Sequence, residues 1–180
     1  MNFIPTPLAG AMIVEPQVFG DDRGFFMETW HREKFAAAGI DVAFDQDNHS
    51  RSAKGVLRGL HYQLPNSQGK LARVALGAVF DVIVDLRRAS PTFGRWLGIE
   101  LSAENKRMLW VPQGFAHGFL VVSELADFLY KCSGLYSAAD EKALRWNDPT
   151  LAIDWPLEGA PCLSAKDAAA PLLADAVLFP

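Results

Sequence analysis

The chain has 180 residues, half of them hydrophobic, and a formal net charge of −4. This length fits one packed core, so we expect residues 1–180 to form a single domain. The acidic balance argues against a nucleic-acid-binding protein, which presents a basic surface, although a few inward-facing cations can still surround a small anion. No apolar run approaches the roughly 20 residues that a membrane-spanning helix requires, so we expect no membrane partner.

The chain contains only two cysteines, Cys132 and Cys162, which lie far apart and lack the spacing of a metal site. This usage predicts reduced thiols and a cytoplasmic location. Residues 1–7 contain two prolines and no basic side chain, so we expect no signal peptide.

Short segments typical of β-strands recur along the chain, separated by Gly, Pro, Asn and Ser. The clearest covers residues 79–86, where apolar side chains alternate with Asp81 and Asp85. Tight hairpin reversals are expected at residues 77–78 and 123–124. Further strands are expected at residues 11–15, 24–30, 46–51, 55–63, 71–76, 96–101, 108–111, 117–122 and 127–136.

Only two segments have helical character. Residues 31–38 are followed by Gly39, which suits the left-handed conformation at a helix C-terminus. Residues 164–173 are rich in alanine and are interrupted by Pro171. Many short strands with few helices predict an all-β sandwich or barrel with short peripheral helices.

His61 carries the clearest chemical signal. It lies in a strand-like run between two cations, Arg58 and Lys70. An imidazole titrates near neutral pH, and a base flanked by cations suits an anionic substrate that must lose a proton. A lone histidine in a strand more often has a structural role, but these neighbours favour a functional one here.

The other three histidines have weaker signals. His31 opens a helix-like segment and is expected at the surface. His49 lies in a polar strand that could line either a pocket or a solvated sheet face. His117 begins an apolar strand after residues 112–116.

Residues 112–117 resemble the second motif of the cupin β-barrels. Metal-binding cupins pair that motif with a His-x-His sequence and a carboxylate, but here the first motif reads His61-Tyr62-Gln63. Because a transition metal usually takes three or four nitrogen or oxygen ligands, we predict neither a metal site nor a cofactor.

The resemblance extends further, to the dTDP-4-dehydrorhamnose 3,5-epimerases, which are metal-free cupin enzymes. It runs from about residue 3 to residue 172, and its motifs follow one another in the family's order. It implies a cupin-type jelly-roll β-barrel or sandwich, and a homodimer whose N-terminal strands extend the partner's sheet. The matching segments are residues 22–28, 46–50, 58–63, 113–119, 129–132, 146–149 and 163–167.

The family epimerises dTDP-4-dehydro-6-deoxy-D-glucose at C3 and C5, on the way to dTDP-L-rhamnose. Both carbons lie next to the C4 ketone, so a base can remove each proton if the enolate is stabilised. By resemblance, His61 is the base, Asp167 orients it, Lys70 stabilises the C4 oxygen and Tyr130 returns a proton on the opposite face. The loop before Lys70 is one residue shorter than the family pattern.

Each of three catalytic assignments has a structural alternative. Residues 164–167 also have the form of a helix capping box, which would use the Asp167 carboxylate. Lys70 could be a solvated loop lysine, and Tyr130 could simply pack within a strand.

The resemblance also assigns substrate contacts to a larger set of polar and aromatic residues. Its cations suit the diphosphate, and its aromatic residue suits stacking on the thymine base. Surface ion pairing is the alternative for Arg23 and Glu141. The set is Arg23, Glu28, Gln46, Asp47, Asn48, Arg58, His117, Tyr136, Glu141 and Lys166.

Three other functions remain open. A sibling enzyme would invert only C3 or only C5, or act on another 4-keto sugar nucleotide, whereas Tyr130 favours double inversion. A metal-dependent cupin enzyme is disfavoured by the missing histidine of the first motif. A non-catalytic sugar-nucleotide-binding barrel is disfavoured because His61, Tyr130 and Asp167 are all present.

Overall fold

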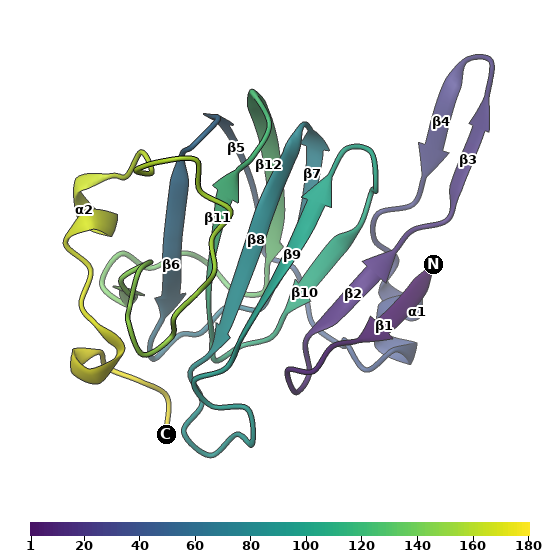
Figure 1. Ribbon diagram of the computed structural model, residues 1–180. Helices are drawn as coiled ribbons and strands as arrows, with labels where there is room; N and C mark the ends of the chain where they lie inside the picture. The colour runs from purple at the N-terminus through teal and green to yellow at the C-terminus, as the bar shows by residue number, and fades with distance from the viewer.

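The computed structural model describes all residues from 1 to 180 and consists mainly of two facing antiparallel sheets (Figure 1). This is the expected jelly-roll class, with short peripheral helices. The six-stranded sheet contains, in spatial order, β1 (Asn2–Pro5), β2 (Met12–Glu15), β10 (Met108–Val111), β7 (Lys70–Leu76), β12 (Leu125–Cys132) and β5 (Gln46–Ala53). The five-stranded sheet contains β13 (Glu141–Ala143), β6 (Leu57–Gln63), β11 (Phe115–Val121), β8 (Ala78–Asp85) and β9 (Trp96–Ser102).

A third, two-stranded sheet projects from the sandwich as a hairpin of β3 (Val18–Asp21) and β4 (Gly24–Met27) (Figure 1). The strand expected at residues 24–30 ends early, at Met27, and β1, β3 and β13 lie outside every expected strand. The hairpin's burial pattern explains why β3 escapes a search for alternation, since all four of its residues are exposed.

The helices are short. Helix α1 (Arg32–Ala37) confirms the first expected helix, and Gly39 has the left-handed φ of +86° that ends it. The helix expected over residues 164–173 is instead α2 (Ala165–Ala168) and a separate 3₁₀ turn, η1 (Leu173–Asp175), divided near Pro171. No helix is long and apolar enough to cross a membrane.

Strand β8 is buried on both faces, and its alternation divides the apolar core in two. Val79 and Ile83 join the core between the sheets. Val82 and Val84 join a second core, where the chain's C-terminal part covers the outer face of the five-stranded sheet. A third cluster packs α1 against the outer face of the six-stranded sheet. The two polar side chains on the interior face of β8 are Asp81 and Asp85. Each accepts hydrogen bonds from a partner, His117 for Asp81 and Arg87 for Asp85, as a buried carboxylate requires.

The two expected hairpin reversals are wrong. Residues 77–78 join β7 to β8, and residues 123–124 join β11 to β12, and each pair of strands belongs to different sheets. A Cβ at Gly77 would lie 1.9 Å from the Leu125 carbonyl oxygen, so this corner requires glycine. The same small residues serve a hairpin turn and a sheet-to-sheet corner, and the sequence does not distinguish them.

Candidate active site

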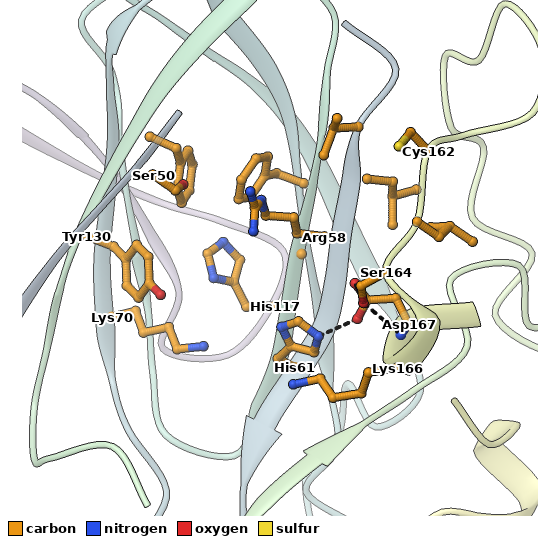
Figure 2. A pocket seen from close by; sticks show the side chains of 16 residues that line it. Ser50, Arg58, His61, Lys70, His117, Tyr130, Cys162, Ser164, Lys166 and Asp167 are labelled. Carbon is orange, nitrogen blue, oxygen red and sulfur yellow. Dashed lines mark hydrogen bonds and ion pairs between the residues drawn. The ribbon is translucent and has the colours of Figure 1, made fainter. Parts of the chain in front are cut away.

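A cavity of about 480 Å³ opens within the sandwich and is lined by both sheets and by the segment that leads into α2 (Figure 2). Its apolar side includes the stacked rings of Phe119 and Phe128, whose centroids are 4.1 Å apart. The cavity brings together all four residues expected to be catalytic. Its polar and charged lining consists of Ser50, Arg58, His61, Lys70, His117, Tyr130, Ser164, Lys166 and Asp167.

His61 and Asp167, 106 residues apart in the chain, form a hydrogen bond of 2.5 Å between Nε2 and Oδ1. The imidazole is 28% exposed and the carboxylate only 4%. Pairing through Nε2 leaves Nδ1 turned toward the cavity (Figure 2). The geometry is that of a base whose orientation is fixed by a buried acid.

The Asp167 carboxylate also serves the helix cap. Its second oxygen accepts a 2.8 Å hydrogen bond from the Ser164 hydroxyl, which in turn accepts from the Asp167 backbone N–H at 3.1 Å. Burial alone would raise the pKa of Asp167, but hydrogen bonds from His61 and Ser164 outweigh it and lower that pKa. The capping box and the imidazole contact therefore coexist, one on each oxygen.

Lys70 and Tyr130 enter the cavity from the six-stranded sheet, on the side opposite His61 and Asp167 (Figure 2). The Lys70 ammonium lies 5.9 Å from the centre of the Tyr130 ring. Burial lowers the pKa of Lys70, against the opposing influence of Cys132, Asp81 and Glu141. Burial raises the pKa of Tyr130, which keeps its hydroxyl protonated at neutral pH. Despite its short preceding loop, Lys70 begins β7 and reaches the cavity.

His117 forms a second histidine–carboxylate pair, which the sequence did not reveal. Its Nε2 lies 3.0 Å from both oxygens of Asp81, and the side chains are 5% and 0% exposed. Asp81 lies in a strand whose two faces are both buried, and a buried carboxylate requires a partner. That requirement is the signal in the sequence that could have predicted the pair. The pair fixes the His117 ring in the cavity wall.

Five of the expected substrate contacts form a connected polar network beside the cavity. A smaller pocket there shares His61 with the main cavity. Glu141 accepts hydrogen bonds from the Tyr136 hydroxyl at 2.9 Å and from the Lys166 ammonium at 2.5 Å. Gln46 accepts from the Tyr136 backbone N–H at 2.8 Å and donates to Asn48 at 2.9 Å. This network joins β5, β13 and α2 at the mouth of the site.

Asp47, another expected substrate contact, lies outside the cavity. Alternation along β5 places Gln46 and Asn48 on the more buried side and Asp47 on the exposed one. There Asp47 pairs with the Lys131 ammonium at 2.8 Å. The Asp47 side chain is thus directed away from this chain's own cavity.

Arg23 and Glu28 also lie outside the chain's own cavity. Arg23 stands at the β3–β4 turn, where it pairs with Asp21. Glu28 follows the hairpin and pairs with Lys34 at 2.7 Å. Arg58, by contrast, lines the cavity.

The cavity's donor groups are arranged in pairs rather than in a metal-binding set. No group of three or more His, Cys, Asp or Glu side chains is placed to hold a metal ion.

Comparison with known proteins places the chain among sugar-nucleotide epimerases. The family model described as dTDP-4-dehydrorhamnose 3,5-epimerase matches residues 5–175. A protein of that name from Pseudomonas aeruginosa is 60% identical over 170 residues, which cover 94% of each chain.

Solved structures agree closely. A dTDP-6-deoxy-D-glucose-3,5-epimerase from Legionella pneumophila, in complex with dTDP-4-keto-L-rhamnose, superposes with a TM-score of 0.94 and 54% identity, covering 96% of this chain and 93% of the relative. A 3'-monoepimerase from Streptomyces bikiniensis, in complex with dTDP-quinovose, gives a TM-score of 0.90 and 38% identity over 95% of this chain and 87% of that one. The chain belongs to the dTDP-4-dehydrorhamnose 3,5-epimerase family.

Proposed function

We propose that the protein inverts C3 and C5 of dTDP-4-dehydro-6-deoxy-D-glucose. Family membership supports the substrate class, and one observation supports the reaction: His61 and Tyr130 reach the cavity from facing sheets. A sugar ring held between them has a proton acceptor on one face and a donor on the other. Inversion requires this arrangement, because a single histidine would tend to restore the original configuration.

The first step is removal of a proton next to the C4 ketone. His61 takes the proton, and the electron pair of the broken C–H bond passes into the enolate, leaving negative charge on the C4 oxygen. Asp167, ionised and hydrogen-bonded to Nε2, stabilises the imidazolium that forms. Lys70 places its ammonium on the other side of the cavity for the developing oxyanion.

The second step is protonation of the same carbon from the opposite face. The Tyr130 hydroxyl supplies this proton; it is protonated at neutral pH, since its pKa lies above the usual tyrosine value of about 10. The His61 imidazolium then releases its proton to solvent and the Tyr130 phenolate takes one up, and the same two steps at the second carbon complete the epimerisation. The reaction is a proton exchange with no net oxidation, so it needs no redox cofactor.

The nucleotide end of the substrate requires cations and an aromatic surface. We assign Arg58 and Lys166 to the diphosphate, since both are cavity cations. Tyr136 is 52% exposed at the mouth and offers its ring to the base, with Gln46 and Asn48 beside it. Glu141 holds the Tyr136 hydroxyl and Lys166, and His117 contacts the sugar.

We also propose a homodimer, in which β1 lies at the free edge of the six-stranded sheet and can pair with a second copy. The projecting hairpin exposes Phe19, Phe25 and Phe26, at 56%, 62% and 69%. Such apolar exposure suits a buried contact. Arg23 at the turn of that hairpin can bind substrate only in the site of another copy.

The location we propose is the cytoplasm. Cys132 and Cys162 are both unpaired, as in proteins of reducing compartments.

Deuterium exchange tests the reaction directly. The protein is incubated with dTDP-4-dehydro-6-deoxy-D-glucose in deuterium oxide, and incorporated label is located by NMR. We expect label at both C3 and C5. Label at one carbon only would identify a single-site epimerase, like the 3'-monoepimerase from Streptomyces bikiniensis. Absence of label would refute the enzyme assignment.

A mixing experiment tests the dimer and the role of Arg23 together. Arg23→Ala and His61→Ala are each expected to be impaired. In a mixed dimer, one site has its own His61 and receives Arg23 from the other protomer, so re-equilibrated mixtures should regain activity. Failure to regain activity, with dimers verified by analytical ultracentrifugation, would show that Arg23 does not act across the interface.

A further inference from the structure

Strand β6 contains a β-bulge between Arg58 and His61. On the neighbouring strand, Arg58 pairs with Phe119 and His61 pairs with His117. Three steps along β6 therefore oppose two steps along β11. The extra residue interrupts the ladder at the centre of the active site, where bulges commonly redirect side chains.

The bulge decides which side chains face the cavity. In a regular strand, residues three apart point to opposite faces. Here Arg58 and His61 both line the cavity, whereas Leu57 and Leu60 both belong to the outer core cluster, with Leu57 also bordering the cavity. The regular alternation of side chains between the cavity face and the outer face of β6 is thus interrupted between Arg58 and Leu60. Without this change, the strand would direct either the guanidinium or the imidazole into the apolar core.

Two glycines make the bulge sterically possible. Gly59 has a φ of +115°, a conformation that side chains disfavour, and a Cβ there would lie 2.5 Å from the Gly118 Cα. A Cβ at Gly118 would lie 2.6 Å from the Arg58 carbonyl oxygen. The two backbones therefore touch directly, immediately beside the paired histidines.

The Leu60 backbone, which follows the displaced Gly59, is hydrogen-bonded from the other side. The Leu60 N–H donates to the Leu144 carbonyl at 3.2 Å, and the Leu144 N–H donates to the Leu60 carbonyl at 2.8 Å. This reciprocal pair, together with the burial of both leucines, holds the bulge in place. Its support makes it a fixed feature of the strand rather than a local irregularity.

We propose that the contact between Gly59 and Gly118 is a positioning device, which sets the direction and separation at which Arg58 and His61 enter the cavity. Gly59 and Gly118 are then positioning residues, since neither offers a side chain to the substrate. The inference rests on the proposed function, in which His61 is the base and Arg58 binds the diphosphate. It explains why a strand that supplies both groups three residues apart must be irregular between them.

The test uses Gly118→Ala, which adds one methyl group against the bulge while its own φ is unexceptional. We expect the turnover number per folded molecule to fall by about 100-fold, as for a small displacement of a catalytic group. We also expect a shift in the NMR signal of the proton between His61 and Asp167, measured with ¹⁵N-labelled histidine. Gly98→Ala is the matched control, because its Cβ would lie 2.2 Å from the Phe80 ring in the same sheet but away from the cavity. It should lower the melting temperature and leave both catalytic readouts unchanged.

Deletion of Gly59 provides a second variant if Gly118→Ala does not fold. It restores regular pairing and keeps the facing of Arg58, Leu60 and His61, yet removes the bulge. We expect a folded protein with low turnover. Normal turnover and an unchanged His61 signal in either folded variant would overturn the inference. If the wild-type protein itself exchanges no deuterium, the proposed function fails, while the His61 signal still tests positioning.

Discussion

His61 and His117 are direct cross-strand partners on β6 and β11, and each imidazole is held by its own buried carboxylate. The two imidazoles differ in their exposure to solvent. The His61 side chain is 28% exposed, whereas the His117 side chain is 5% exposed. The more exposed His61 suits the proposed proton transfer, whereas the buried His117 suits the proposed fixed contact with the sugar.

This difference predicts that His61→Ala abolishes deuterium exchange at both carbons. Loss of a positioned general base typically costs 10²- to 10⁴-fold, and we expect a loss of roughly that size. The measurement is the initial rate of label incorporation by NMR. His49→Ala is the control, since the His49 ring is 57% exposed beside Asp127, outside the cavity. Residual exchange near the wild-type rate in His61→Ala would assign the base elsewhere.

Tyr130→Phe should separate proton removal from inversion. The variant keeps His61, Asp167 and Lys70, so we expect exchange at the substrate carbons to continue. Because the phenolic proton is missing, inversion at C5 should be impaired, and inversion at C3 with it, since the same hydroxyl is proposed to serve both carbons. The check compares label incorporation with the stereochemistry of the product in one reaction. An inversion rate equal to that of the wild-type protein would mean that another group donates the proton.

The sequence predicts much of the fold, because alternation and turn residues are local signals. The two faces of β8 illustrate this: as expected, Val82, Val84 and Leu86 pack together on one face and Asp81 and Asp85 lie on the other, which they share with Val79 and Ile83. The end of α1 before Gly39 is another local signal that the structure confirms. A corner between two sheets depends on strands that are distant in the sequence, so the local pattern around Gly77 predicts a hairpin instead.

The site is harder to predict because its contacts join distant parts of the chain. Spacing alone does not connect His61 to Asp167, and only the family resemblance suggested that pair. The His117–Asp81 pair was missed because each partner lies in a separate strand. The same alternation rule that would have placed Asp47 outside the cavity fails for Arg58, whose facing depends on the bulge.

Lys70 should give the enzyme an alkaline limit below the usual lysine range. The role proposed for Lys70 requires its ammonium form, and burial lowers the pKa of Lys70. Activity should therefore decline as the pH rises through that lowered value. Lys70→Gln should reduce turnover by roughly 10²- to 10³-fold, as for other lost oxyanion contacts. The measurement is the pH–rate profile of the wild-type protein and of Lys70→Gln. Lys131→Gln is the control, because Lys131 pairs with the exposed Asp47. A wild-type alkaline limb that persists in Lys70→Gln would contradict the assignment.

Asp85 should contribute to stability in acid. Burial opposes its charge, but hydrogen bonds from Arg87, Ser90 and Thr92 prevail and lower the pKa of Asp85 to about 2. A carboxylate with a lowered folded pKa stabilises the protein fully above its unfolded pKa of about 4 and loses that effect as the pH falls toward 2. The contribution at neutral pH is about 2 kcal/mol.

Denaturant titrations at several pH values measure this effect. Asp85→Asn should be destabilised at neutral pH, and its difference from the wild-type protein should shrink between about pH 4 and pH 2. Glu158→Gln is the control, because the Glu158 side chain is 80% exposed in its pair with Lys54. Its effect should remain within about 0.5 kcal/mol. A difference for Asp85→Asn that is independent of pH would contradict the linkage.

Ser164 links the stability of α2 to the chemistry of Asp167. Its hydroxyl caps the helix and donates to the carboxylate that holds His61, and this hydrogen bond helps to lower the pKa of Asp167. Ser164→Ala should therefore cost about 1 kcal/mol of stability. It should also raise the pKa of Asp167, so that activity is lost at a higher pH on the acid side. Ser164→Thr retains a hydroxyl and should restore both the stability and the acid limb. If Ser164→Ala lost stability without any shift of the acid limb, Ser164 would act only as a helix cap.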